Sequence, residues 1–449
     1  MIATLHHLWQ MTRTSFWFVP TLIVLGAVGL ATCLVALEAN NDVDFGKKWP
    51  LLFGAGASGS RGLLSAVASS MITVAGVVFS ITIVALSLTS SQYTSRVLRN
   101  FMRDRMNQVV LGVFLGVFAY CLVVLRTIRD GDEGAFVPSL AVFGGLALAF
   151  VGTAFLIYFI HHIAMSIQAS SIIAEAAEET ISAVDHLFPK EAGESADEDT
   201  DDNRVAALDE QVWSAIVARK TGYIESIGGD SLLAWARTHG AIVRMERGIG
   251  EFVVEGAPLM SVACPGGPDD AAAAELSAAY VISRHRTVQQ DVSFGIRQIV
   301  DIAIKALSPG INDTTTAVMC VDYLAAILAR LAVREIATPH REDEGELRVI
   351  TRGPRFETLL AEAFDQIRQN AGGNVAVLTR QLQSLETIAG QTTNRQRQQS
   401  LRQHADLITA MAKRTIPSPE DGEGVHAAAV RLSRILDGLT CDPTSPLDL

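Results

Sequence analysis

Hydroxyl and glycine residues recur along one uncharged stretch that begins near Ser65, in a pattern that suits permeation. Most stand seven positions apart, close to two helical turns, so they share one slowly drifting stripe of a helix. The members of this stripe are Thr73, Gly76, Ser80, Ser87 and Thr94. Hydroxyl oxygens can replace part of an ion's hydration shell, so the stripe could line a pore. The same composition is typical of a tight contact between two helices.

Arginines follow the stripe where the helix would leave the membrane. Arg96, Arg99 and Arg103 share one helical face because they stand three and four positions apart. We interpret them as a basic collar around the cytoplasmic mouth of a path. Such a collar would favour anions over cations.

A second set of polar residues lies in the run SFGIRQIVDIAIKALSPGINDTTTA, residues 293–317. Its first half is a helix with an intrahelical charge ladder of Arg297, Asp301 and Lys305, and Ser308-Pro309-Gly310 ends that helix. Asn312 and Asp313 then precede the next helix, whose free amides beside Lys305 could hold a small anion. We favour a structural corner, because a single carboxylate that caps a helix is routine.

The sequence gives little support for catalysis. It contains no G-x-S-x-G, Walker loop, HExxH or dinucleotide fingerprint. Four aspartates could in principle bind magnesium, but helical spacing puts Asp291 and Asp301 on different faces, and no histidine accompanies Asp313 and Asp322. We predict no catalytic residue, no metal site and no cofactor, and an enzyme is the minority interpretation.

Composition defines the class of protein in which these residues stand. Of 449 residues 49% are hydrophobic, and the mean hydropathy of +0.29 is too high for an ordinary soluble enzyme. The net charge of −12 supplies no basic field for nucleic acid. The five cysteines are scattered without a disulfide pattern, which suits soluble parts in a reducing cytoplasm.

Four apolar stretches in the first 160 residues are each long enough to cross a bilayer as a helix. We place them at 16–37, 65–89, 107–125 and 138–160. Four spans leave both termini on one side, and the arginine-rich loop after the second span places that side in the cytoplasm. The two opposite loops also carry Lys and Arg, so the reduced cysteines and the large C-terminal part decide this topology.

The rest of the chain divides by pattern. We expect an α-helical membrane domain of four spans, then a C-terminal α+β cytoplasmic domain with a small β-module and a helical layer. The helix of the fourth span should continue without a break to Phe188, since no glycine or proline interrupts it. The expected parts are 1–160 (membrane), 161–189 (helical extension), 190–203 (acidic disordered linker), 204–268 (β-rich, half-barrel-like) and 269–440 (helical, with the SPGIND corner).

Two long runs carry a family resemblance. GVVFSITIVALSLTSSQYTSRVLRNFMRD and QDVSFGIRQIVDIAIKALSPGINDTTTA, together with the four N-terminal spans, resemble the domain of unknown function 2254 family of predicted bacterial integral membrane proteins. The resemblance implies a membrane-embedded bacterial protein whose signature includes the SPGIND corner. It implies no reaction and no substrate.

Two functions therefore remain open. The first is a homo-oligomeric channel- or transport-like protein of the bacterial cytoplasmic membrane, with the stripe as its lining and the cytoplasmic domain assembling or gating it. The alternative is a membrane-anchored sensor or scaffold that binds a small anion or a protein partner. The expected partners are membrane lipid, further copies of the chain and a small anion, with no nucleic acid. Whether the stripe is buried inside one protomer discriminates the two.

Overall fold

The chain forms two compact units, residues 1–171 and 172–449, which are treated separately. The computed structural model describes residues 17–40, 56–92, 105–129, 136–188, 211–336, 340–343 and 345–438. Thr94, the arginine collar and the acidic linker lie outside these described residues.

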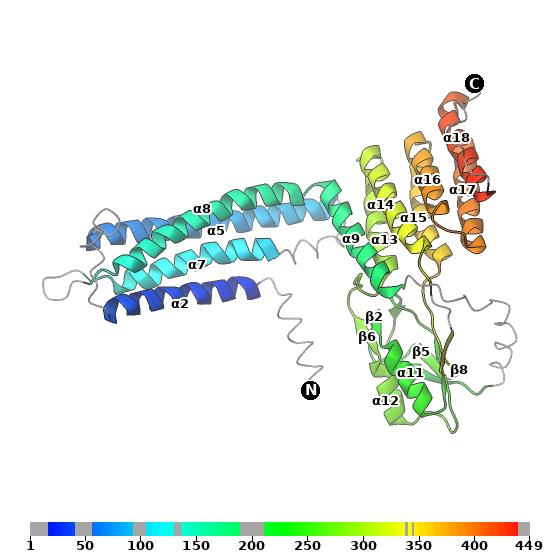
Figure 1. The fold of residues 1–449 in the computed structure, drawn as a ribbon, viewed down its shortest axis with the longest axis horizontal. Coiled ribbons are helices and arrows are strands. Elements are labelled where there is room, and N and C mark those ends of the chain that lie inside the picture. Colours follow the sequence, from blue (N-terminus) through cyan, green and yellow to red (C-terminus); the bar gives the residue numbers. More distant parts are fainter. Residues whose placement is uncertain are drawn as a thin grey trace. The chain divides into compact units, whose positions relative to one another are not determined.

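Unit 1 contains four long helices that run side by side (Figure 1). They are α2 (Phe18–Asn40), α5 (Ala57–Gln92), α7 (Arg105–Thr127) and α8 (Ser139–Ser166). At about 1.5 Å per residue, even the shortest of them can cross a hydrocarbon layer of about 30 Å. Helix α7 is the central one, because it contacts the other three and half of its apolar stretch is buried.

Small residues allow α7 to pack closely. A Cβ atom on Gly112 would lie 2.8 Å from Cδ1 of Ile23 and 3.0 Å from Cα of Pro20, so a larger residue there would force α2 or the Ile23 side chain to shift. On the other side of α7, the fully buried Tyr120 donates a hydrogen bond of 2.8 Å to the Ala141 carbonyl of α8. The Gly112-x-x-x-Gly116 spacing thus serves packing within one protomer.

Among the described residues, five helices rather than four meet the length and hydropathy expected of a membrane span. The fifth is α14 (Thr314–Ala332), which belongs to unit 2 and packs against α13 (Val292–Ala306) and α16 (Val375–Ala389). The predicted count of four spans is therefore not confirmed by length and composition alone.

The continuous helix predicted from Pro138 to Phe188 is wrong, because the structure divides it into α8 and α9 (Ala169–Leu187). At the break the Gln168 amide bonds to the Met165 carbonyl, three residues back, so the α-helical ladder stops. One turn earlier the Ser166 hydroxyl donates to the His162 carbonyl at 2.9 Å, a side-chain bond that often bends a helix.

Unit 2 contains two sheets. The first has five strands in the order β1-β5-β3-β8-β7, and the second has three in the order β4-β2-β6. Their bounds are β1 Ser214–Val217, β2 Gly222–Ile227, β3 Ile242–Met245, β4 Phe252–Val253, β5 Pro258–Ala263, β6 Tyr280–Ser283, β7 His340–Asp343 and β8 Glu346–Ile350. Strands β4 and β5 are joined by a turn in which Gly256 adopts a φ of +83°.

Three of these strands lie in 269–440, the part that was expected to be helical. Strands β6, β7 and β8 come from that region, and β8 pairs in parallel with β3 through Val243 and Val349. Helices α11 (Gly229–Thr238) and α12 (Asp270–Ala278) contact the sheets, as Figure 1 shows. The β-module is thus completed by strands far along the chain.

The helical layer of unit 2 stands beside the sheets in Figure 1. It consists of α13, α14, α15 (Phe356–Ala371), α16, α17 (Arg395–Thr415) and α18 (Pro419–Leu436). Side-chain caps begin most of these helices, for example Asn374 on α16 and Asn394 on α17. Helix α13 is amphipathic and buries Ile296, Ile299 and Val300 completely.

Candidate functional site

Helix α5 has two faces of opposite character. The packed face contacts α7 and α8 and repeats about every seven residues. Its members are Leu64, Ala68, Met71, Ala75, Val78, Thr82 and Ala85, all buried. The glycines of α8 accept this face, since a Cβ on Gly152 would lie 3.0 Å from Sδ of Met71.

The predicted stripe lies on the other side of α5. Thr73, Gly76, Ser80 and Ser87 are all exposed, and Ser80 is about 200° around the helix from buried Val78. A Cβ on Gly76 would meet no atom within 4 Å. Unit 1 therefore leaves this face uncovered among its described residues.

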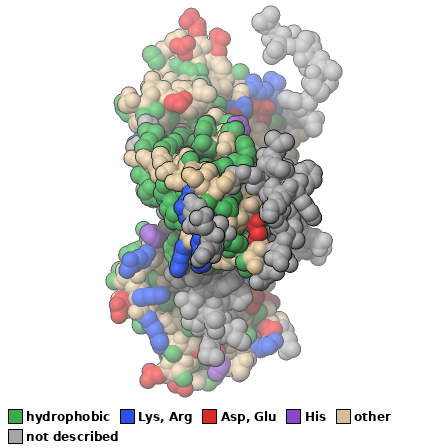
Figure 2. All heavy atoms as spheres, turned by 90° about the vertical axis from the view of Figure 1, so that its left-hand side faces the viewer, with side chains coloured by type: hydrophobic (Ala, Val, Ile, Leu, Met, Phe, Trp, Pro, Cys, Tyr) green, Lys and Arg blue, Asp and Glu red, His purple; other side chains and the backbone are tan. Residues whose placement is uncertain are grey.

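Large apolar side chains flank the stripe on both sides. Phe79 and Ile83 border one edge, with exposed fractions of 49% and 47%, and Val77 and Ile81 border the other. Figure 2 shows hydrophobic side chains over much of the described surface of unit 1. The flanks suit lipid, whereas the stripe between them presents hydroxyls and a bare backbone.

The hydroxyls of the stripe are suited to a polar or closely packed environment. Oγ1 of Thr73 donates to the Ser69 carbonyl at 2.8 Å, so its proton is satisfied within the helix while the oxygen can still accept a hydrogen bond. Gly76 allows another backbone to approach closely. This arrangement can bind a second helix or line a water-filled path.

The SPGIND corner is built around Asp313. Its Oδ1 accepts the Thr316 amide at 3.0 Å and its Oδ2 accepts the Thr316 hydroxyl at 2.6 Å, so the carboxylate caps α14. These hydrogen bonds from the side chain and amide of Thr316 lower the pKa of Asp313. The residue before it, Asn312, adopts a φ of +49°, a left-handed turn that asparagine tolerates.

The remaining corner residues lie as follows. Arg297 and Asp301 form an ion pair of 2.8 Å one helical turn apart on α13. Lys305 is half-buried in the last turn, and the Ser308 hydroxyl donates to its carbonyl at 2.6 Å. Asn312 and Asp313 are exposed. The Asp313 carboxylate thus occupies the helix terminus that an anion would need.

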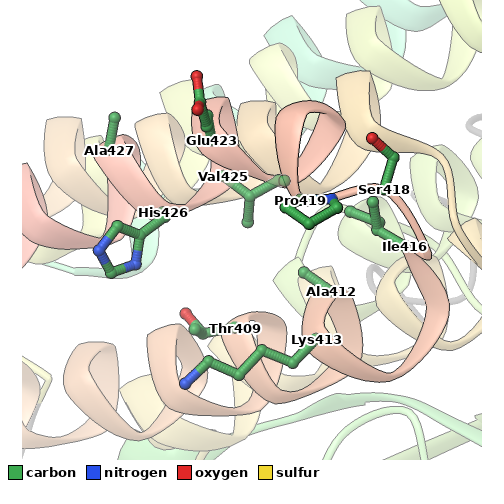
Figure 3. Close-up of a pocket in the computed structure, with 11 residues that line it drawn as sticks. Thr409, Ala412, Lys413, Ile416, Ser418, Pro419, Glu423, Val425, His426 and Ala427 are labelled. Atoms are coloured by element: carbon green, nitrogen blue, oxygen red, sulfur yellow. The ribbon is translucent and has the colours of Figure 1, made fainter.

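A groove of about 380 Å³ lies between α17 and α18. Ala412, Ile416 and Val425 form an apolar part of its wall, while Lys413 and His426 stand at its rim (Figure 3). Both rim residues are exposed to solvent. The groove is open to solvent and its lining is mainly apolar. We therefore rank it below the stripe as a candidate functional site.

One cluster that the structure brings together has no signal in the sequence. Asp185 of α9 forms two hydrogen bonds with Arg330 of α14, of 2.6 and 2.8 Å, and also pairs with Arg334. The partners are about 145 positions apart, so helical spacing could not have paired them.

Comparison with known proteins supports the resemblance. A family model described as a predicted membrane protein, DUF2254, matches residues 13–387. Uncharacterized proteins of Mycobacterium tuberculosis and Mycobacterium bovis are each 34% identical to this chain over 431 residues, which is 94% of this chain and 81% of each relative. No solved structure matches significantly. The chain belongs to the DUF2254 family.

The extent of the match separates the sites of this DUF2254 protein. The matched region contains both the α5 stripe and the SPGIND corner, whereas the groove between α17 and α18 lies beyond its end at residue 387. The stripe and the corner therefore lie in the part that the family model describes, and the groove does not.

Proposed function

We propose that this DUF2254 protein is a homo-oligomeric, channel- or transport-like protein of the bacterial cytoplasmic membrane, with α5 stripes from several copies facing a shared aqueous path. The observation that carries the proposal is the open face of α5. Thr73, Gly76, Ser80 and Ser87 are exposed there, whereas the apolar face of the same helix is fully packed.

Membrane physics explains why that face needs an occupant. Lipid tails gain nothing from a bare glycine backbone or from hydroxyl oxygens, whereas a neighbouring helix packs closely on small residues. Water gains hydrogen bonds from the same oxygens. The flanking Phe79 and Ile81 suit lipid or an apolar neighbour, so a ring of copies could place only the stripe on its axis.

The topology of the proposal follows from packing. We place α2, α5, α7 and α8 across the membrane and α14 inside the soluble part, since α14 packs among the helices of unit 2. Both termini then lie in the cytoplasm, and Arg96, Arg99 and Arg103 follow α5 at the cytoplasmic end of the path. Their charge favours the passage of anions.

The alternative, an anchored sensor with an anion site at the SPGIND corner, is less well supported. Any anion bound at the start of α14 would have to displace the Asp313 carboxylate from Thr316. We therefore assign the corner a structural role, with Asn374 Nδ2 of α16 donating to Thr314 Oγ1 at 2.7 Å to hold it in place.

Anion flux from proteoliposomes tests the proposal. The wild-type protein should release chloride or iodide faster than protein-free liposomes, and Ser80→Leu should slow release about tenfold, because it replaces a hydroxyl in the path by an apolar side chain. Ile81→Leu is the matched control, since it introduces the same side chain on the flank one residue away. No flux from the wild type, or equal flux from Ser80→Leu, would contradict the proposal.

A further inference from the structure

Helix α9 connects unit 2 to α8 through only two non-helical residues, Ile167 and Gln168. Its buried side is a narrow seam of small and β-branched residues, of which Ile173, Thr180 and Val184 are completely buried. Along the chain, α8 and α9 are therefore separated by two residues alone.

The middle of α9 packs closely against α13 at Gly295. A Cβ atom on Gly295 would lie 2.9 Å from Cβ of Thr180 and 2.8 Å from its Cγ2, so a larger residue at position 295 would push α9 away. The Thr180 hydroxyl donates to the Ala176 carbonyl of its own helix. Contact between the two helices is therefore steric and depends on a glycine inside α13.

An ion-pair cluster holds the C-terminal end of α9 against α14. Asp185 bonds to both Arg330 and Arg334, and Nη1 of Arg334 also donates to the Phe188 carbonyl at 3.1 Å. Asp185 and Arg330 have side-chain exposures of 37% and 38%, whereas Arg334 has only 5%. The outer pair is open to water and salt, while the inner arginine remains buried.

Arg397 of α17 binds the backbone next to the arginines of this cluster. Nη1 of Arg397 donates to the Ala332 carbonyl at 2.8 Å, and Nη2 donates to the Arg334 carbonyl at 3.0 Å. These bonds tie the end of α14 to the start of α17. The arginines that contact α9 are thus tied to a third helix.

We propose that α9 is a latch through which the α13–α14 pair controls the proposed channel. In this latch the Thr180–Gly295 contact stays in place, and the ion pairs of Asp185 are the contacts that break. Release frees the end of α9, and the two-residue joint passes its movement to α8. The control of transport rests on the proposed function, whereas the release of α9 can be measured without it.

Hydrogen–deuterium exchange of the full-length protein in nanodiscs tests the latch. Asp185→Asn should raise exchange about tenfold over the second half of α9 and over the last turn of α8, with α15 and α16 unchanged. Gly295→Ala should raise exchange over α9 as a whole. Gly422→Ala is the matched control, because it also places alanine in a helix but meets no atom within 4 Å.

The outcomes separate the latch from the channel. Unchanged α9 exchange in both variants, or loosening spread evenly through unit 2, would overturn the latch. Loosening of α9 without any change in α8 would overturn the transmission step. If the wild type shows no flux but the exchange results hold, the proposed function fails and the latch stands. If flux is present, Asp185→Asn should change it severalfold, and unaltered flux would contradict control by α9.

Discussion

The glycines of α7 and those of α5 occupy similar membrane helices but meet very different surroundings. Gly112 and Gly116 of α7 face Ile23 and Ala27 of α2, and a Cβ on either glycine would lie 2.8 to 3.3 Å from the nearest of their atoms. A Cβ on Gly62 or Gly76 of α5 would meet nothing within 4 Å in the part of the chain that the structure describes. Glycine in α7 thus packs against a neighbouring helix of the same protomer, which we call a closed position. Glycine in α5 has no such neighbour among the described residues, which we call an open position.

This difference teaches how to separate folding from assembly. A closed position such as Gly112 stabilises the protomer through contacts with its own helices, so its substitution should act on stability. An open position such as Gly76 has no such contact to lose. Its substitution should act on whatever covers α5 in the membrane.

Exchanging the two glycines for leucine gives the largest expected contrast. Gly112→Leu should destabilise the protomer by about 1–3 kcal/mol or more through overpacking against Ile23. Gly76→Leu should leave the unfolding temperature in detergent unchanged and lower the oligomer mass measured by light scattering. If Gly76→Leu unfolds the protomer, or leaves the mass unaltered, the contrast fails.

The SPGIND corner is also held by contacts within one protomer. Substitutions there should therefore change the stability of unit 2. Asp313→Ala removes the cap of α14 and should destabilise unit 2 by about 1 kcal/mol in thermal unfolding. Asp313→Asn, which retains a capping oxygen, should be nearly neutral. An increase in anion affinity without loss of stability in Asp313→Ala would instead favour a ligand site.

Low pH should lower the stability that the Asp313 and Asp185 carboxylates contribute. The pKa of Asp313 is lowered by hydrogen bonds from Thr316, and that of Asp185 by its bond from Arg330. A lowered folded pKa gives stability that is complete above the ordinary carboxyl value of about 4 and is lost as pH falls through the folded value. Asp313→Ala should therefore lose less stability than the wild type as the pH falls from about 5 to about 2, measured by thermal unfolding.

Tyr120→Phe should have the smallest effect. It removes the hydrogen bond from Tyr120 to the Ala141 carbonyl between α7 and α8. Interhelical hydrogen bonds in membranes contribute about 0.6 kcal/mol on average, so the unfolding temperature should fall only slightly. Oligomer mass and flux should remain as in the wild type. A loss of either would show that this contact acts on assembly and not only on the stability of the protomer.

Local signals predicted a large part of the fold. Apolar length predicted the four helices described in unit 1, and the position of Asp313 just before the next helix predicted the cap of α14. The part predicted to be β-rich, 204–268, contains strands β1 to β5. The positions of the stripe residues on α5 also followed from helical spacing, although only the structure shows that this face is open.

Features that depend on distant residues escaped prediction. Strand β8 forms because β3 offers it a parallel edge, roughly a hundred residues away, and nothing local in Glu346–Ile350 reveals that edge. The Asp185 cluster likewise joins helices far apart in sequence. The break between α8 and α9 is set by backbone bonds at Met165 and Gln168, without a proline or glycine to announce it.

Cysteine cross-linking in native membranes tests the central claim most directly. In a background that lacks the five native cysteines, Ser80→Cys should link copies of the chain and react with a membrane-impermeant maleimide, because position 80 faces shared water. Val78→Cys, buried on the packed face, should do neither. A Ser80→Cys protein that stays monomeric and unlabelled would contradict the account.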